Sequence, residues 1–389
     1  MTPTTHRMDA LRRFVAREVG ADLTIAPASA DASFRSYWRV SGASEKRPLP
    51  PSAPSPAAQG KGQHERSTDE SFLRAAGEAG GSRKGAAQSQ ADVPTHIVMD
   101  APPAQENIEP WLDIGARLRA AGLHAPEIFA VDRDNGFILM EDLGTRTYLP
   151  ELDETTVDAL YADALDALLR MQTRVDPAGL PAFDEAFLTM ELELMPEWFL
   201  RRHLGHTVDC DEWDVIEVAF RTLITSARAQ PQSFMHRDYH SRNLLVVDAD
   251  NPGIIDFQGA MTGPVTYDLA SLLRDCYIDW DAERVDGWVE SYRQRLKHAH
   301  LIDTQTDPAR YRRWFDLAGL QRHIKVLGIF CRLWYRDGKP QYLADLPLTW
   351  HYVISVARRY EELAPMADLL ERALGGRDIT QPRSEAASS

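Results

Sequence analysis

The sequence has 389 residues, of which 44% are hydrophobic, so the chain can form two ordinary domains or one large bilobal unit with a sizeable core. Its 58 acidic residues outnumber its 43 basic residues and give a formal net charge of −15. A surface this acidic repels phosphate backbones and anionic lipids. We therefore expect neither nucleic acid nor a membrane surface as a general partner.

The cysteines and the N-terminal residues indicate a cytoplasmic protein. Cys210, Cys276 and Cys331 are widely spaced and form no C-x-x-C pair, which favours reduced thiols over a zinc site or a disulfide framework. Leu11 and Phe14 lie at helical spacing among charges near the start of the chain, as in an amphipathic helix. No apolar run approaches the roughly 18 residues that a membrane span requires.

A change of composition interrupts the first part of the chain. Residues 22–41 predict a strand, a turn and a second strand, with DASFRSYWRV leading into the second strand. Residues 43–92, approximately, are then dominated by Ser, Ala, Gly, Pro and Gln. Such a segment buries too little apolar surface to offset the entropy lost on ordering. We predict a disordered insertion that is dispensable for catalysis.

Regular patterns resume after the insertion. Residues 95–103 predict a short strand that ends at two prolines, and residues 108–121 predict a helix that Gly122 is placed to end. Residues 127–132 and 137–140 predict two further strands around an Asp-Asn-Gly turn. Up to this point the sequence predicts a small lobe rich in strands, with one added helix.

The second half of the chain is predominantly helical in pattern. Apolar residues recur at helical spacing over 154–172, and further helices are predicted near 185–204, 211–229 and, with breaks, from 267 to 374. Three short strands are predicted between these helices, at residues 233–236, 244–248 and 253–257.

These elements predict an α+β, bilobal architecture. We expect residues 1–141 to form a small mixed N-lobe with an antiparallel sheet, and residues 142–376 to form a large, mostly helical C-lobe. Residues 377–389 are expected to be a flexible tail. The two lobes would leave a cleft, and the hairpin of 244–257 would deliver its ends into that cleft.

Two acids and an amide stand at the ends of the predicted hairpin strands. The run HRDYHSRN contains Asp238 and Asn243, and IIDFQ follows the hairpin with Asp256. Phosphoryl transfer needs an aspartate that faces the attacking hydroxyl, and an asparagine with a second aspartate that hold magnesium against the phosphate. The spacing therefore predicts a kinase that uses ATP and Mg²⁺.

The pattern H-x-D-x-x-x-x-N followed by I-D-F resembles the aminoglycoside phosphotransferase family, whose members are related to the eukaryotic protein kinases. Over most of the chain outside the insertion, DASFRSYWRV, VMDAPP, ILMEDLG and IDFQGAMTGPVTYDLASLLRDCY resemble the bacterial anomeric kinases of N-acetylmuramate and N-acetylglucosamine. That resemblance implies a protein-kinase-like fold and phosphorylation of a sugar C1 hydroxyl in cell-wall recycling.

The resemblance assigns roles by position. Asp238 is expected to be the catalytic aspartate, Asn243 and Asp256 the magnesium ligands, and His236 a structural residue of the loop. Residues 141–144, with Glu141, Asp142 and Leu143, are expected to meet the adenine of ATP.

One departure from protein kinases concerns the nucleotide phosphates. The expected third strand reads HIVMD, without the lysine that pairs with these phosphates in protein kinases. Arg35 and Arg39 are the candidates to replace it, although exposed strand charges explain them equally well.

Acceptor selection is expected from the helical lobe. N-acetylmuramate carries a carboxylate, so a cationic partner is expected for it. The candidate acceptor residues are Arg274, Asp275, Arg322 and Lys325, for which ordinary ion pairs between helices are the competing interpretation.

Other interpretations remain open. The chain could phosphorylate an aminoglycoside or another small hydroxyl compound, or it could be a nucleotide-binding pseudokinase. His236, Asp238 and His240 also spell H-x-D-x-H, a possible zinc or iron cluster of a hydrolase. We expect a monomer that acts on a small amino sugar.

Overall fold

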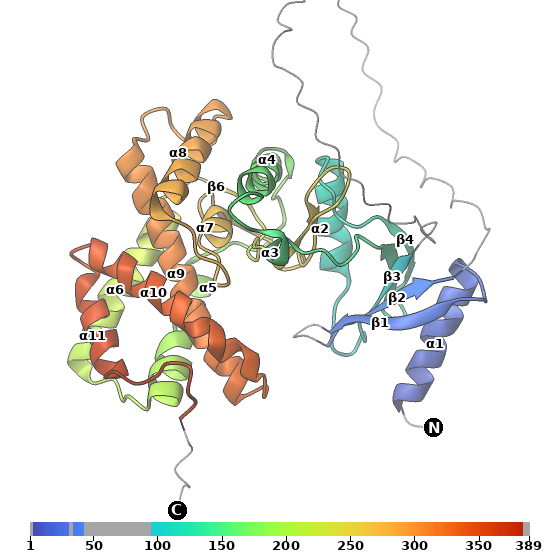
Figure 1. Ribbon diagram of the computed structural model, residues 1–389, viewed down its shortest axis with the longest axis horizontal. Coiled ribbons are helices and arrows are strands. Elements are labelled where there is room, and N and C mark those ends of the chain that lie inside the picture. Colours follow the sequence, from blue (N-terminus) through green and yellow to red (C-terminus); the bar gives the residue numbers. More distant parts are fainter. Residues whose placement is uncertain (1–2, 31–33, 43–94, 384–389) are drawn as a thin grey trace, which may run out of the picture. The chain divides into compact units, whose positions relative to one another are not determined.

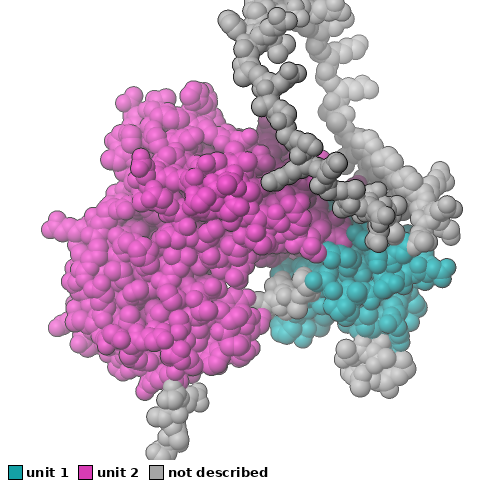
Figure 2. Space-filling view, viewed as in Figure 1, with its two compact units in different colours: residues 1–106, 128–141 teal, residues 107–127, 142–389 magenta. Residues whose placement is uncertain are grey.

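The computed structural model describes residues 3–30, 34–42 and 95–383. The chain divides into two compact units, which Figure 2 shows in different colours. The first unit comprises Met1–Glu106 and Ile128–Glu141, and the second comprises Asn107–Glu127 and Asp142–Ser389. The predicted insertion at about 43–92 lies outside the described residues.

The first unit contains an antiparallel sheet of five strands in the order β1-β2-β3-β5-β4 (Figure 1). Tyr37 of β2 pairs with Met99 of β3, and Met99 in turn pairs with Ile138 of β5. The predicted strands are confirmed, with these bounds: β1 Thr24–Ala30, β2 Ser36–Ser41, β3 His96–Asp100, β4 Ile128–Asp132 and β5 Phe137–Glu141.

Helix α1 (Pro3–Glu18) packs its apolar side on this sheet. Leu11 and Phe14, which the sequence placed on one helical face, are buried against sheet residues that include Val98 and Phe137. The Arg7 side chain donates to Asp100 at the end of β3 (Nε to Oδ1, 2.8 Å). Helix and sheet therefore share one apolar core and one ion pair.

Helix α2 (Glu109–Ala120) belongs to the second unit. It ends where the sequence predicted, because Gly122 has φ +77°, a conformation that glycine adopts without steric cost. The backbone N–H of Leu123 then donates to the Leu118 carbonyl (3.0 Å). Trp111 on the buried side of α2 stacks against Phe257 with ring centroids 5.0 Å apart.

The rest of the second unit is mostly helical, and its core surrounds the long helix α9. Helix α9 contacts α5, α6, α7, α8 and α10 and is buried over most of its length. In the described residues, no helix is both long and apolar enough to cross a bilayer. The helices are α3 Tyr148–Glu151, α4 Val157–Arg174, α5 Glu185–Leu192, the π-helix η1 Met195–Leu204, α6 Cys210–Arg228, α7 Tyr267–Leu273, α8 Ala282–His298, α9 Pro308–Tyr335, the 3₁₀ helix η2 Pro340–Asp345, α10 Leu346–Arg359 and α11 Ala364–Leu374.

Two small strand pairs lie among these helices. Strand β6 (Gln232–Met235) pairs with β9 (Met261–Pro264), and β7 (Leu244–Leu245) pairs with β8 (Gly253–Ile254). The predicted strands at 244–248 and 253–257 are confirmed as a hairpin but are shorter than expected. Strand β9 was not predicted, because Gly263 and Pro264 are typical of turns.

The last described residues are held against the second unit, whereas the sequence predicted a flexible tail at 377–389. The Ile379 side chain is buried, and its carbonyl lies 2.7 Å from Nε2 of His203. The Arg377 side chain donates to the Leu204 carbonyl, and the Tyr335 hydroxyl accepts the backbone N–H of Arg383 (2.9 Å). The tail prediction therefore does not describe the segment up to Arg383.

Candidate active site

The loop between β6 and β7 and the end of the β7/β8 hairpin place Asp238, Asn243 and Asp256 together. The backbone N–H of Ile255 donates to the Asn243 carbonyl (3.1 Å), which joins the two segments. The Asn243 side-chain amide lies 2.9 Å from the Asp238 carbonyl and 3.4 Å from Oδ2 of Asp256. The three residues that the sequence predicted as catalytic and metal-binding therefore form one cluster.

Asp256 has a backbone conformation that is rare for a residue with a side chain. Its φ is +62°, in the left-handed region, and residues held in this way are concentrated at functional sites. The Gln258 side chain donates to Oδ1 of Asp256 (2.6 Å), while Oε1 of Gln258 is buried and has no hydrogen-bond partner among the described residues. The strained backbone and the amide together set the direction of the Asp256 carboxylate.

The donor chemistry of this cluster suits magnesium. Mg²⁺ takes oxygen ligands and is usually held by one or two carboxylates together with phosphate oxygens and water. The Asp256 carboxylate and the Asn243 side-chain amide carry oxygens of this kind, and the two side chains are neighbours, with Nδ2 of Asn243 3.4 Å from Oδ2 of Asp256. Among the residues that the structure describes, no group of three or more His, Cys, Asp and Glu side chains is placed to hold a metal ion.

His236 is buried, and both of its ring nitrogens are engaged within the loop. Nδ1 lies 3.3 Å from the backbone N–H of Asp238, and Nε2 lies 3.1 Å from the Ile255 carbonyl. Burial lowers the pKa of His236 to about 4, so the ring is neutral at physiological pH. This arrangement favours the expected structural role over the alternative of a zinc or iron ligand.

Asp268 in α7, which was not predicted from the sequence, holds the backbone of this loop. Its carboxylate accepts the backbone N–H of His236 (2.6 Å) and of Arg237 (2.8 Å). Arg237 has φ +80°, and its guanidinium lies 2.9 Å from the buried Glu191 carboxylate. The sequence does contain a feature that points to Asp268. It is the one acidic residue in the apolar run TYDLASLL, and a buried carboxylate needs hydrogen-bond partners.

Burial raises the pKa of Asp268 to about 7, whereas the two backbone hydrogen bonds lower it. The neighbouring charge of Asp238 also raises it. With a pKa of about 7, the Asp268 carboxyl exchanges its proton near neutral pH, under the influence of the negative charge of Asp238.

Positive side chains surround Asp238. Burial opposes its ionisation, but the charges of Lys325 and Arg237 outweigh this effect, so the pKa of Asp238 lies below its ordinary value. Lys325 is buried in α9, where its ammonium donates to the Tyr267 hydroxyl (2.9 Å) and lies 3.6 Å from Glu191. Asp238 is therefore a carboxylate at neutral pH.

The four predicted acceptor residues fall into two pairs. Arg322 and Lys325 lie on the side of α9 whose charges act on Asp238. The Arg322 guanidinium lies 3.1 Å from the Cys276 sulfur, and within the described part of the chain its buried Nε has no hydrogen-bond partner. Arg274 instead pairs with Asp316 (Nη2 to Oδ1, 2.6 Å), and Asp275 accepts the backbone N–H of Ser241 in the loop (3.0 Å).

The residues that were predicted to bind the nucleotide are divided between the two units. Arg39 lies on β2 between Trp38 and Val40, which both pack in the core with α1, so Arg39 points to the opposite face of the sheet. Arg35 directly precedes β2. Glu141 ends β5 in the first unit, and Asp142 and Leu143 begin the main part of the second unit, where the Asp142 side chain accepts the backbone N–H of Gly144 (2.9 Å).

Comparison with known proteins extends the resemblance seen in the motifs. Residues 85–314 match the phosphotransferase enzyme family. The N-acetylmuramate/N-acetylglucosamine kinase of Pseudomonas putida is 43% identical over 280 residues, which cover 72% of this chain and 82% of that protein. The enzyme of the same name from Neisseria meningitidis is 37% identical over 287 residues, which cover 73% and 85% of the two chains. These matches confirm the predicted resemblance.

Solved structures show a similar fold. The ethanolamine kinase of Plasmodium vivax has a TM-score of 0.55 and 10% identity, covering 88% of this chain and 86% of that one. The choline kinase of Cryptosporidium parvum has the same score and identity, covering 93% and 99%. The predicted protein-kinase-like α+β fold is confirmed, with a small antiparallel sheet in one unit and mostly helices in the other.

Proposed function

Because the chain belongs to the phosphotransferase enzyme family, we propose that it transfers the γ-phosphate of ATP to the anomeric C1 hydroxyl of N-acetylmuramate, N-acetylglucosamine or both. The observation that carries phosphoryl transfer is the convergence of Asp238, Asn243 and Asp256. The acceptor comes from the names of the relatives in Pseudomonas and Neisseria. The C1 position and a role in peptidoglycan recycling come from the resemblance to the anomeric kinases.

Asp238 is the proposed proton acceptor. Its pKa lies below the ordinary value, so it is ionised when the acceptor binds, and it can accept a hydrogen bond from the attacking hydroxyl. An anomeric hydroxyl is more acidic than an ordinary alcohol. A weakly basic carboxylate is therefore sufficient, because proton removal can lag behind formation of the bond to phosphorus.

Asn243 and Asp256 are the proposed ligands of Mg²⁺. When bound, the ion neutralises charge on the phosphate oxygens and holds them in place. The protein contributes the direction of the ligands: Gln258 donates to the Asp256 carboxylate, and Asn243 donates to the Asp238 carbonyl. These bonds join both ligands to the loop that carries the proposed proton acceptor.

The first unit and the connection to the second are proposed to bind ATP. The segment Glu141, Asp142 and Leu143 would offer backbone groups to the adenine edge, as the resemblance implies. Arg35 and Arg39 are proposed to approach the phosphates in place of the lysine that β3 lacks.

Arg322 and Lys325 are proposed to favour an anionic acceptor such as N-acetylmuramate. Both are buried, and their positive charges act on the surroundings of Asp238. Asp275 is proposed to support the acceptor site through its hydrogen bonds to Ser241 in the loop, whereas the Arg274 side chain is directed to Asp316.

The experiment that tests the proposal measures ADP release with ATP and Mg²⁺ against a panel of acceptors. The panel contains N-acetylmuramate, N-acetylglucosamine, kanamycin, choline and homoserine, and the Asp256→Ala variant serves as the blank. We expect release with the acetylated sugars alone. The product should carry a phosphate that is labile to acid and stable to alkali, as a sugar 1-phosphate is.

Other outcomes would replace the proposal. Release with kanamycin or choline alone would make the chain a kinase for another class of acceptor. Measurable ATP binding without release in the presence of any acceptor would favour a nucleotide-binding pseudokinase.

A further inference from the structure

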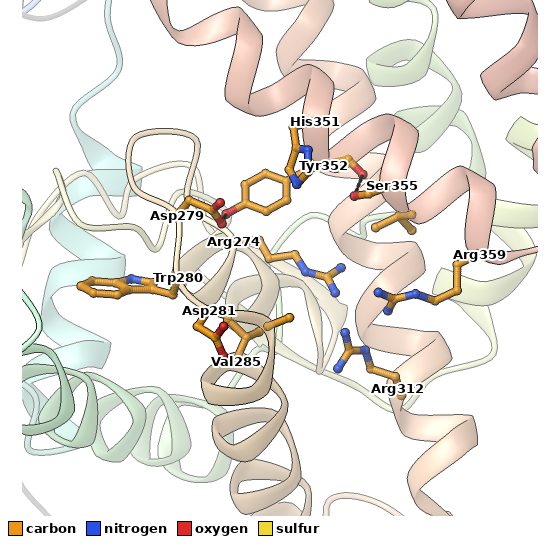
Figure 3. A pocket seen from close by; sticks show the side chains of 12 residues that line it. Arg274, Asp279, Trp280, Asp281, Val285, Arg312, His351, Tyr352, Ser355 and Arg359 are labelled. Carbon is orange, nitrogen blue, oxygen red and sulfur yellow. Dashed lines mark hydrogen bonds between the residues drawn. The ribbon is translucent and has the colours of Figure 1, made fainter.

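A cavity of about 380 Å³ lies in the second unit, between the segment after α7, the start of α8, and facing sides of α9 and α10. Figure 3 shows the side chains that line it. None of these twelve residues comes from the 236–243 loop or from the β7/β8 hairpin. The cavity is therefore distinct from the surroundings of Asp238.

Three arginines of the cavity share one carboxylate. Asp316 of α9 is fully buried, and it accepts hydrogen bonds from Arg274 (Nη2 to Oδ1, 2.6 Å), Arg312 (Nε to Oδ1, 3.0 Å) and Arg359 (Nη1 to Oδ2, 2.7 Å). Arg312 has a second partner in Asp286, whose side chain is 56% exposed. At this end of the cavity, positive charge is only partly compensated.

The Arg274 guanidinium is an example of this incomplete compensation. Arg274 is 6% exposed, and its Nη1 is buried without a hydrogen-bond partner in the part of the chain that the structure describes. Leaving a buried charged donor unsatisfied is costly, so a ligand that accepts from this cluster would be stabilised. Burial lowers the pKa of Arg312, as do the charges of Arg274 and Arg359, although Asp316 acts in the opposite direction.

The other side of the cavity has different chemistry. Trp280 and Tyr352 are almost fully buried, and the Trp280 ring packs against Tyr161 and Trp288 and donates to the Tyr161 hydroxyl (3.1 Å). Asp279 accepts the Tyr352 hydroxyl (2.8 Å), and Asp281 accepts the backbone N–H of Glu283 at the start of α8 (2.9 Å). Figure 3 shows Asp279 and Asp281 on one side of the cavity, with the guanidinium groups of Arg312 and Arg359 on the other.

We propose that this cavity binds a small sugar-like oxyanion, with its phosphate or carboxylate at Arg274, Arg312 and Arg359 and its ring towards Asp279 and Asp281. Guanidinium groups match the geometry of both oxyanions. Hydroxyl or amide donors of the ring would face Asp279 and Asp281. A cavity of about 380 Å³ falls within the range of small-molecule sites, roughly 300–1,000 Å³.

The helical period of α9 supports a second site rather than an extension of the first. Arg312 and Asp316 are four residues apart and share one face of the helix. Arg322 and Lys325, whose charges act on Asp238, lie on another face, about a third of a turn away. A ligand at Asp316 and an acceptor at Asp238 therefore occupy different sides of α9.

Binding is tested without turnover, and a variant of Arg359, which lines this cavity, separates binding here from binding of an acceptor near Asp238. The protein is first saturated with a non-hydrolysable ATP analogue and Mg²⁺, so that an oxyanion cannot bind in place of the nucleotide phosphates. Inorganic phosphate, N-acetylglucosamine 1-phosphate, N-acetylmuramate and neutral N-acetylglucosamine are then titrated by calorimetry. The two oxyanion sources are distinguished by which titrant binds more tightly.

The informative variant is Arg359→Gln, because the Arg359 side chain is 46% exposed and its removal leaves the core intact. We expect the variant to bind the preferred oxyanion about tenfold more weakly, and Arg359→Lys to recover much of the loss. Arg313→Gln, on the same helix but paired with Glu362, is the matched control and should bind as the wild type does.

Two results would overturn the proposal. One is the absence of saturable binding by any of the three anions. The other is an affinity in Arg359→Gln equal to that of the wild type. Asp316→Asn should have the opposite effect on affinity. It removes the carboxylate that competes for the three arginines, so the folded variant should bind the oxyanion more tightly.

Discussion

The Asp268 carboxylate accepts the backbone N–H of Arg237 at 2.8 Å, one residue before Asp238. It also accepts the N–H of His236, so one side chain of α7 holds two consecutive peptide groups of the loop. Arg237 has a left-handed backbone conformation that costs free energy for a residue with a side chain. The position of Asp238 therefore depends on a residue that would contact neither substrate.

Replacing Asp268 with asparagine should damage both stability and turnover. An amide presents one oxygen and an NH₂ group to the two backbone donors, so one donor loses its acceptor. We expect the free energy of unfolding in urea to fall by about 2 kcal/mol and kcat to fall at least tenfold. Asp166→Asn, which removes an exposed ion pair with Arg295, is the control and should change stability by less than about 1 kcal/mol. Equal effects of the two variants would contradict the role of Asp268.

Asp238→Asn should separate binding from chemistry. The amide keeps the size of the side chain but cannot accept the proton of the acceptor, so kcat should fall by roughly 10²- to 10⁴-fold while ATP affinity stays close to that of the wild type. The measurements are ADP release and equilibrium binding of a fluorescent ATP analogue. Asp248→Asn, in the exposed turn of the hairpin, is the control. Undiminished turnover in Asp238→Asn would remove this residue from the proposed role.

Lys325→Met should move the pH profile of the reaction. The charge of Lys325 lowers the pKa of Asp238, so its loss raises that pKa, and a larger fraction of Asp238 is protonated at a given acidic pH. We expect the acidic limb of the plot of kcat/KM against pH to shift upward. Lys297→Met, on α8, should leave the profile in place. An acidic limb that does not move, in a variant that retains activity, would show that Lys325 does not act on the proton acceptor.

His236 should make the protein less stable in mild acid. Its pKa is about 4 in the folded protein, against an ordinary value of 6.5, so between these values the unfolded chain binds a proton that the folded protein does not. Stability attributable to this histidine is present above pH 6.5 and is lost as the pH falls towards 4, by up to about 3 kcal/mol. The difference in unfolding free energy between wild type and His236→Gln should narrow over this range. A constant difference would contradict the prediction.

Removal of the last described segment should destabilise the second unit. A chain that ends at Gly376 loses the buried Ile379 side chain and the hydrogen bonds to His203 and Tyr335. We expect a loss of about 2 kcal/mol in the free energy of unfolding. A chain that ends at Arg383 retains these contacts and should match the full chain. Equal stability of the two truncated chains would mean that the segment contributes nothing.

Local patterns predicted much of the fold. The strands of the first unit alternate or end at turn residues, and Gly122 ends α2 as expected, because these features depend on neighbours in the chain. Strand β9 was missed, and the helix predicted near 185–204 is divided into α5 and the π-helix η1. Strand β9 contains Gly263 and Pro264, and it forms because β6, about thirty residues earlier, supplies its hydrogen-bond partners.

The site was predicted to the extent that one loop and one hairpin define it. Asp238, Asn243 and Asp256 are joined by contacts within a span of about twenty residues. Arg274 and Asp275, by contrast, have partners that are distant in the sequence. Arg274 pairs with Asp316, 42 positions away, and Asp275 with Ser241, 34 positions away. Such pairings depend on how helices pack, which no local spacing reveals.

Helix α9 carries Arg312 and Asp316 towards the oxyanion cavity and Arg322 and Lys325 towards the surroundings of Asp238. Each residue added to an α-helix turns the remainder of the helix by about 100° and advances it by about 1.5 Å. One inserted or deleted residue between Asp316 and Arg322 would therefore rotate one pair of side chains away from its partners while the other pair stayed in place. The number of residues between Asp316 and Arg322 therefore matters to both sets of contacts at once.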